Sequence, residues 1–249
     1  MFVTTKGIIL SKTKYSDSSF IVKIYTEKFG VQSFLIKNGY SRKNHLSNAL
    51  FSNLAILELI FDDRNLHKIN FIKEADVIYH YKEIPFDIVR NAVFVFYNEL
   101  FAKLLYYADD DPQLYQIIEN SLIELDKEGI IRPDIHLLFL VKLLYHLGII
   151  PQNNYTNTHC YFSIENALFE SQYCKKETYL SKEASAYFSN IMDGKTDTIP
   201  AKNIRKELLA GLINYLMIHY EHIHQILSVE MMEEVLRKEE PSMRNSKIL

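Results

Sequence analysis

The sequence predicts an α+β protein in which a small antiparallel β-barrel precedes an α-helical region. Apolar residues alternate with a period of two within the first 80 residues, whereas beyond Pro85 they recur with the period of a helix. The charge changes as well, because residues 1–45 carry eight basic and two acidic groups, whereas residues 81–249 carry 17 basic and 24 acidic groups. We therefore expect two domains, 1–80 and 81–249.

The first region is predicted to contain five strands. In the second of them Phe20, Val22 and Ile24 form an apolar face, and Phe34 and Ile36 repeat this face after a turn. No helical pattern separates the first three strands, and such a run of short strands is typical of the five-stranded oligonucleotide-binding (OB) barrel. The expected strands cover residues 3–14, 20–26, 33–37, 54–61 and 65–79.

The second region is predicted to be helical. The acidic run 109–111 before Pro112 suits a helix start, because acidic groups favour the positive end of the helix dipole. Residues 151–179 have no clear period, and within this irregular insert we expect 161–169 to pair as a short hairpin. The polar tail from Glu239 is expected to fray. The expected helices cover residues 86–107, 111–127, 133–147, 181–192, 202–227 and 228–238.

Composition and spacing disfavour several classes of protein. No uninterrupted apolar run approaches the roughly 18 residues that a membrane span requires, and the N-terminus lacks the layout of a signal peptide. The seven glycines never have the spacing of a phosphate-binding loop or of a dinucleotide fingerprint. We therefore expect a cytoplasmic protein without a membrane partner, and neither a nucleotide-driven enzyme nor a serine hydrolase.

The basic first region combines lysines and tyrosines, as protein surfaces that bind nucleic acid do. Single strands are held by cations that neutralise phosphates and by aromatic faces on which bases stack. Lys37, Arg42 and Lys43 share one short stretch with Tyr40, and this cluster favours nucleic-acid binding most strongly. For any single residue the alternative is a solvated or packing side chain. The predicted DNA-binding residues are Lys12, Lys14, Tyr15, Lys23, Lys37, Tyr40, Arg42 and Lys43.

Three motifs follow one another in the first 45 residues. They are Lys12-Thr-Lys-Tyr-Ser-Asp-Ser-Ser-Phe-Ile-Val22, Tyr25-Thr-Glu-Lys-Phe-Gly30 and Ser33-Phe-Leu-Ile-Lys37. In order and spacing they resemble the N-terminal domain of the bacterial recombination mediator family RecO. One departure is that residues 38–41 separate Lys37 from Arg42, where the family usually has Lys-Gly followed directly by basic residues.

The resemblance implies an OB barrel with a helical body and a role in homologous-recombination DNA repair. RecO proteins bind single- and double-stranded DNA, anneal complementary strands, and help recombinase to load together with RecR and single-stranded DNA-binding protein. They are not enzymes that break bonds, so neither a catalytic residue nor a cofactor is implied, and the protein is expected at the nucleoid.

The family also implies that the helical region binds the acidic, hydrophobic C-terminal tail of single-stranded DNA-binding protein. Such a tail needs an apolar cleft and a nearby cation for its carboxylate. Because the helical region is acidic as a whole, the attraction must be local. Two groups of cations are candidates: Arg132 and Lys142, and Lys202, Arg205 and Lys206. For any single one of them the alternative is a solvated residue at a helix end, so the partner is predicted here and the contacting residues are not.

Metal chemistry is the main alternative that the residues raise. Many RecO proteins carry a four-cysteine zinc site, but this chain offers only Cys160 and Cys174 and no Cys-x-x-Cys pair, so we expect it to fold without zinc. A metal-dependent hydrolase built on His219 and His222 is conceivable, although His219 falls on the apolar stripe of its helix and is expected to pack. A protein-interaction scaffold that ignores DNA is the third hypothesis.

Overall fold

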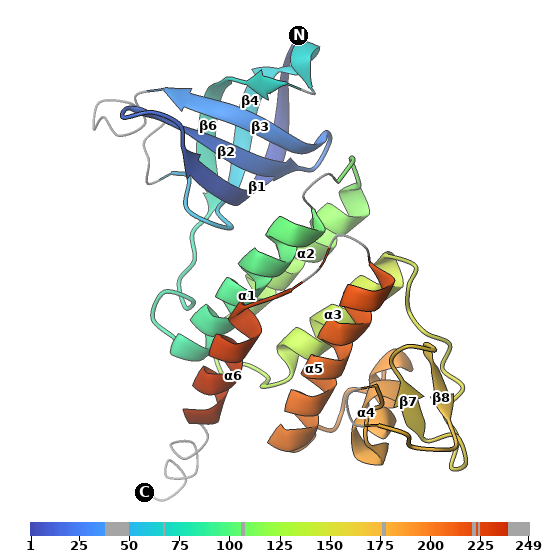
Figure 1. Cartoon of the computed structure of the whole chain (residues 1–249). Helices are drawn as coiled ribbons and strands as arrows, with labels where there is room; N and C mark the ends of the chain where they lie inside the picture. Colours follow the sequence, from blue (N-terminus) through green and yellow to red (C-terminus); the bar gives the residue numbers. More distant parts are fainter. Residues whose placement is uncertain are drawn as a thin grey trace, which may run out of the picture. The chain divides into compact units, whose positions relative to one another are not determined.

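The computed structural model describes residues 1–37, 50–66, 68–105, 108–175, 178–220, 223 and 225–238 (Figure 1). It confirms the predicted α+β class, because a β-sheet region is followed by helices. By compactness the chain forms two units, Met1–Glu128 and Gly129–Leu249. The first unit therefore includes two helices that follow the strands.

The sheet contains six strands instead of the five predicted. They are β1 (Phe2–Lys14), β2 (Ser19–Thr26), β3 (Gly30–Lys37), β4 (Ile56–Asp62), β5 (Ile69–Asn70) and β6 (Ile72–Tyr79), in the order β5-β3-β2-β1-β4-β6. The strand predicted over 65–79 is divided at Phe71. Its first part pairs parallel with β3 and its second part antiparallel with β4, at opposite edges of the sheet. No ladder joins β5 to β6 in the described residues, so hydrogen bonds do not close the predicted barrel.

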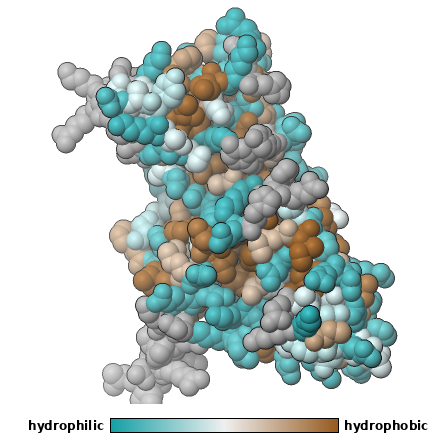
Figure 2. All heavy atoms as spheres, in the orientation of Figure 1, coloured by the Kyte–Doolittle hydropathy of each residue, from teal (hydrophilic) through white to brown (hydrophobic). Residues whose placement is uncertain are grey.

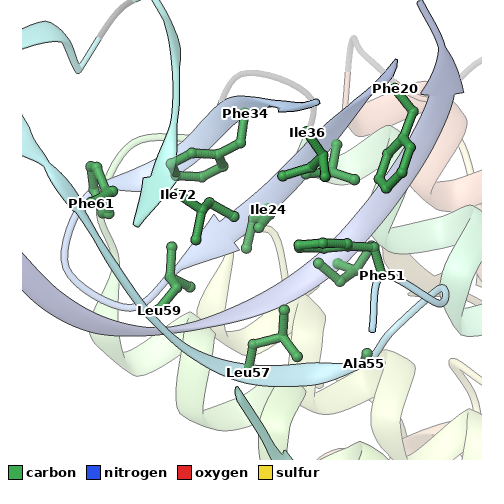
Figure 3. Packing of buried hydrophobic residues seen from close by; sticks show 12 residues of the cluster. Phe20, Ile24, Phe34, Ile36, Phe51, Ala55, Leu57, Leu59, Phe61 and Ile72 are labelled. Carbon is green, nitrogen blue, oxygen red and sulfur yellow. The ribbon is translucent and has the colours of Figure 1, made fainter. Parts of the chain in front are cut away.

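The alternating apolar residues build the core of this sheet. Phe20 pairs with Ile36 and Val22 with Phe34, and residues paired across neighbouring strands lie on the same face. All four side chains are buried, and Phe61 of β4 meets the ring of Phe34 edge-on at a centroid distance of 5.1 Å. Figure 3 shows the side chains of β2, β3 and β4 converging on one cluster.

Helices α1 (Ile88–Leu104) and α2 (Pro112–Leu125) complete the first unit. Each begins after an aspartate, Asp87 or Asp111, whose carboxylate accepts hydrogen bonds from backbone N–H groups of the first turn. The buried Arg90 of α1 donates to the backbone carbonyls of Leu125 and Lys127 at 3.0 and 2.8 Å, which ties α1 to the end of α2.

Hydrogen bonds join the turn between β2 and β3 to the segment that precedes α2. Gly30 has a positive φ of 59°, and a Cβ atom there would lie 2.5 Å from the carbonyl oxygen of Ala108. The Val31 N–H donates to that oxygen at 3.0 Å, and the Tyr25 hydroxyl donates to the carbonyl of Asp111 at 3.1 Å. A residue with a side chain would therefore be strained at position 30.

Asp126 makes a second link, between the end of α2 and the segment after β6. Its carboxylate accepts hydrogen bonds from the backbone N–H groups of Lys82, Glu83 and Ile84 and from the hydroxyl of Tyr79. Burial alone would raise the pKa of this carboxyl, but these hydrogen bonds together hold it below its ordinary value. These contacts explain why the first compact unit, Met1–Glu128, includes α1 and α2 as well as the strands.

The second unit is mainly helical and contains one small hairpin. Its elements are α3 (Ile135–His146), β7 (Tyr161–Ser163), β8 (Leu168–Glu170), α4 (Lys182–Met192), α5 (Lys202–His219) and α6 (Ser228–Lys238). The hairpin of β7 and β8 occupies the place where the sequence indicated one.

The helix predicted over 202–227 ends earlier than expected, because α5 stops at His219 and Tyr220 is extended. The buried Ile223 and Ile226 prolong the apolar stripe beyond the helix, which is why periodicity overestimated its length. Within the described part of the chain, the helices are too short or too polar to span a bilayer.

Candidate nucleic-acid interface

The strand register divides the predicted site residues between the two faces of the sheet. Lys12 pairs with Val22 and Lys14 with Phe20, and both partners belong to the core. These two lysines therefore share the core-side face, at the end of β1 where it becomes exposed. The ammonium of Lys12 lies 5.6 Å from the ring centroid of Phe20, and partial burial lowers its pKa.

The β1–β2 loop carries the predicted aromatic residue Tyr15. Its side chain is 64% exposed, so it is available for stacking rather than for core packing. Beside it, the ammonium of Lys14 lies 3.3 Å from the carboxylate of Asp17, an exposed pair that contributes little to stability. Lys12, Lys14 and Tyr15 thus belong to one end of the sheet.

Lys23 and Lys37 lie on the opposite face. Lys23 pairs with Ser33, and Ser33 pairs in turn with Ile69 of β5. Lys37 is four residues beyond Ser33 on β3, so the period of two places it on the same side. We call this surface the outer face; its residues on β2, β3 and β5 are Ile21, Lys23, Ser33, Leu35, Lys37 and Ile69.

Phe71 extends the outer face, and sequence reasoning missed it. Its side chain is 55% exposed, and the ammonium of Lys37 lies 5.0 Å from its ring centroid. Within a single predicted strand over 65–79 Phe71 could not be told from a core residue. Its only signal was its position between Lys68 and Lys73. An exposed aromatic ring under a cation is suited to contact a nucleobase that lies beside a phosphate.

A groove of about 560 Å³ adjoins the outer face alongside β3. Its basic lining comes from Lys23, Lys28 and Lys68, and Ile69 belongs both to the groove and to the outer face. Figure 2 shows hydrophobic residues interspersed among hydrophilic ones on the visible surface of the strands. A mixture of cations and accessible apolar side chains is what single-strand binding surfaces use.

Three of the predicted site residues, Tyr40, Arg42 and Lys43, lie outside the described residues. Lys37 is the last described residue before them. Their part in DNA binding therefore stays a prediction. In the described structure, the predicted lysines and Tyr15 form two groups, one on the outer face and one at the exposed end of β1.

The residues considered for metal chemistry do not form a site in the described ranges. Cys160 is buried, Cys174 is exposed, and neither forms a disulfide. His219 is half-buried, stacks on Tyr215 at a centroid distance of 4.2 Å and contacts the carbonyl of Ile164 through Nε2 at 3.1 Å. No group of three or more potential ligands gathers in these ranges, and His222 lies outside them.

Fold and surface define the first unit as an OB-type β-domain supported by two helices. The family model described as recombination protein O N terminal matches residues 1–81, and the model described as recombination protein O C terminal matches residues 85–225. The chain therefore belongs to the RecO family, and the resemblance inferred from the three N-terminal motifs is confirmed.

Curated relatives carry the same family name over nearly the whole chain. The DNA repair protein RecO of Azobacteroides pseudotrichonymphae is 26% identical over 239 residues, which is 94% of this chain and 99% of that protein. The DNA repair protein RecO of Bacteroides fragilis is 28% identical over 240 residues with the same coverage. That of Porphyromonas gingivalis is 30% identical over 153 residues, 61% of this chain. The protein is thus a member of a bacterial DNA repair and recombination family.

Proposed function

We propose that this protein is a DNA-binding recombination mediator that holds single- and double-stranded DNA on the β-domain. The observation that supports this most directly is the outer face, where Lys23 and Lys37 accompany the exposed ring of Phe71. Lysines beside phosphates release counterions and bind without reading sequence, and a stacked aromatic ring accepts any base. The surface is therefore expected to tolerate all sequences.

Annealing of complementary strands follows from the same chemistry. Two strands repel each other through their phosphates, and a basic surface that neutralises part of this charge lowers the repulsion. No bond is made or broken, so the protein needs no catalytic residue and no cofactor for this role. Recruitment of RecR, loading of recombinase and residence at the nucleoid are parts of the proposal that rest on family membership.

Charge reversal on the outer face tests DNA binding. The double variant Lys23→Glu, Lys37→Glu should weaken binding of a fluorescent single strand by at least about tenfold, because two phosphate contacts become repulsive. The matched control is Lys127→Glu, Lys195→Glu, which changes the net charge equally at exposed lysines elsewhere. If both double variants lost the same affinity for the single strand, the loss would reflect only the change in net charge. This result would contradict a DNA-binding site on the outer face.

For the tail of single-stranded DNA-binding protein we propose the cation group at the start of α5. Arg132, of the other group, donates two hydrogen bonds to the fully buried carboxylate of Asp134, at 3.0 and 2.8 Å, and that carboxylate would lose its counter-charge if Arg132 turned to a ligand. Lys202, Arg205 and Lys206 line a small cavity whose apolar walls include Leu209, so cations and apolar side chains occur together there. This combination suits the acidic and apolar parts of such a tail.

The neighbouring helix α6 already contacts two of these cations. Its Glu233 pairs with Lys206 at 2.7 Å, and the Leu236 carbonyl accepts from Lys202 at 3.1 Å. Burial lowers the pKa of His136 in the same cavity to about 4, so His136 is neutral at pH 7 and adds no charge. A tail carboxylate must therefore compete with α6 for these cations.

A tail peptide measured by calorimetry against the full chain tests this site. Lys206→Ala should weaken binding several-fold, whereas Glu233→Gln should strengthen it, because the competing carboxylate is gone. Lys142→Ala, in the other candidate group, serves as the control. Unchanged affinity in both Lys206→Ala and Glu233→Gln would contradict the site, and loss in Lys142→Ala would move it to α3.

A further inference from the structure

Strand β6 ends the sheet on one side, and its outer edge is long. In the described part of the chain β6 pairs with β4 on one side and has no ladder partner on the other. The strand at the opposite end of the sheet, β5, contains two residues, whereas β6 contains eight. Every second residue of β6 therefore directs its N–H and C=O groups away from β4, and a row of such groups pairs readily with another backbone. We call this row the free edge of β6.

The register with β4 defines the apolar side of the free edge. Leu57 and Leu59 point into the core cluster (Figure 3), and they pair with Val77 and Ala75 of β6. Both residues of β6 are only half-buried, although Leu57 and Leu59 are fully buried. The core is thus incompletely covered along β6, which leaves apolar surface for one further strand.

A groove of about 460 Å³ continues this apolar side. Val77 and Tyr79 of β6 line it together with Leu50 and Ala55. Successive side chains of a strand point to opposite faces, so a strand added to β6 directs every second side chain toward the groove. The groove therefore favours a segment in which apolar residues alternate with others.

The opposite side of the free edge is acidic. Glu74 and Asp76 are exposed on the face turned away from the core, and Glu58 of β4 pairs with Asp76 across the ladder. In the described residues Glu58 and Asp76 form no ion pair, whereas Glu74 lies 3.4 Å from the ammonium of Lys73. Three carboxylates against one lysine repel nucleic acid and attract a basic segment.

The same charges argue against a second copy of this chain as the occupant. Residues that pair across two strands lie on the same face, so two free edges joined to each other would bring Glu74 and Asp76 of both copies together. Like charges in such positions destabilise the pairing, and charged edges commonly prevent self-association. A strand with basic side chains on this face removes the repulsion.

We propose that the free edge of β6 docks an extended basic segment of another protein. The segment adds one strand to the sheet through its backbone, its basic side chains face Glu74 and Asp76, and its alternate apolar side chains enter the groove beside Val77. This surface uses neither Lys23 nor Lys37, so it is distinct from the proposed DNA-binding surface.

A short fluorescent peptide in which arginine alternates with valine tests the proposal on the full chain. Anisotropy should show saturable binding in the micromolar range, and hydrogen exchange should slow at amides of β6. The same peptide with glutamate in place of arginine should not bind. Methylation of the backbone nitrogens of the arginine peptide should weaken binding by at least about tenfold, because the pairing hydrogen bonds are lost.

Charge exchange on β6 tests the orientation of the segment. Glu74→Lys with Asp76→Lys should weaken binding of the arginine peptide about tenfold and allow the glutamate peptide to bind, because the sign of the cross-strand pairs is reversed. Asp17→Lys with Glu124→Lys is the matched control, since it changes the net charge equally at exposed carboxylates elsewhere.

Three results would overturn the proposal: no saturable binding of the arginine peptide, equal binding of its backbone-methylated form, or equal weakening by the two double variants. A dimer of the full chain that the arginine peptide dissociates would assign the free edge to a second copy instead. Thermal unfolding detects a variant that fails to fold, and the comparison of peptides on the wild type decides in that case. None of these results bears on the proposed DNA binding.

Discussion

Replacing Asp126 by alanine should destabilise the first unit by about 3–4 kcal/mol. The buried carboxylate accepts hydrogen bonds from the N–H groups of Lys82, Glu83 and Ile84 at 2.8 to 2.9 Å and from Tyr79 at 3.1 Å. Hydrogen bonds to charged groups contribute about 1.5–3 kcal/mol each, and neutral ones about 0.5–1.5 kcal/mol. Because Lys82 is exposed and Tyr79 and Glu83 are half-buried, water can compete for part of these hydrogen bonds, and about 1 kcal/mol for each of the four is the appropriate magnitude.

The contribution of Asp126 should depend on pH in a defined direction. Its pKa in the folded protein lies below its ordinary value. The stabilisation is therefore fully present above the pKa of the unfolded chain, about 3.9, and is lost as the pH falls through the lower folded value. The difference in stability between wild type and Asp126→Ala should be constant from about pH 5 to 7 and should shrink below about pH 4.

Urea denaturation followed by circular dichroism measures both quantities. Asp126→Asn is the matched variant, since it keeps one acceptor oxygen and should lose about half as much stability as Asp126→Ala. A loss below about 1 kcal/mol for Asp126→Ala would refute the role of this carboxylate in fastening the segment after β6. A stability difference that grows toward low pH would refute the sign of the pKa shift.

Three further predictions concern the packing of the first unit and the cysteines. Gly30→Ala should cost about 2 kcal/mol or more in urea denaturation, whereas Gly129→Ala, also at positive φ but with open space around it, should cost less. The Lys6–Glu119 ion pair, 3.0 Å long and half exposed at the lysine, should show a coupling of only about 0.5 kcal/mol in a double-mutant cycle. Elemental analysis should find well under one zinc per chain, and stoichiometric zinc that is lost on Cys160→Ser would contradict this.

Periodicity alone predicted the two sides of the central strands. Phe20, Val22 and Ile24 alternate with polar or half-buried residues. Because side chains of a strand point alternately to its two faces, these three residues must share the face that packs in the core. The helix starts at Asp87 and Asp111 were also predictable within a few residues, because an aspartate before an apolar run is a strong N-cap signal.

The candidate site was less predictable because it depends on contacts between distant strands. A bulge between Ile9 and Ser11 shifts the register of β1, so the sequence could not tell that Lys12 and Lys23 lie on opposite faces. The division at Phe71 exists because residues 69–70 pair with β3 while residues 72–79 pair with β4, and neither pairing is local. The groove beside β3 likewise needs residues 108–110, which belong to the helical part of the sequence.

A salt titration of single-strand binding tests the central claim most directly. Fluorescence anisotropy of the full chain with several unrelated sequences should give a log affinity that falls with log salt at a slope of about −3 to −5, as expected for about four to six neutralised phosphates. The slope should be the same for every sequence, and Lys23→Glu with Lys37→Glu should make it shallower. A flat salt response, or a slope that this double variant leaves unchanged, would contradict DNA binding by the outer face.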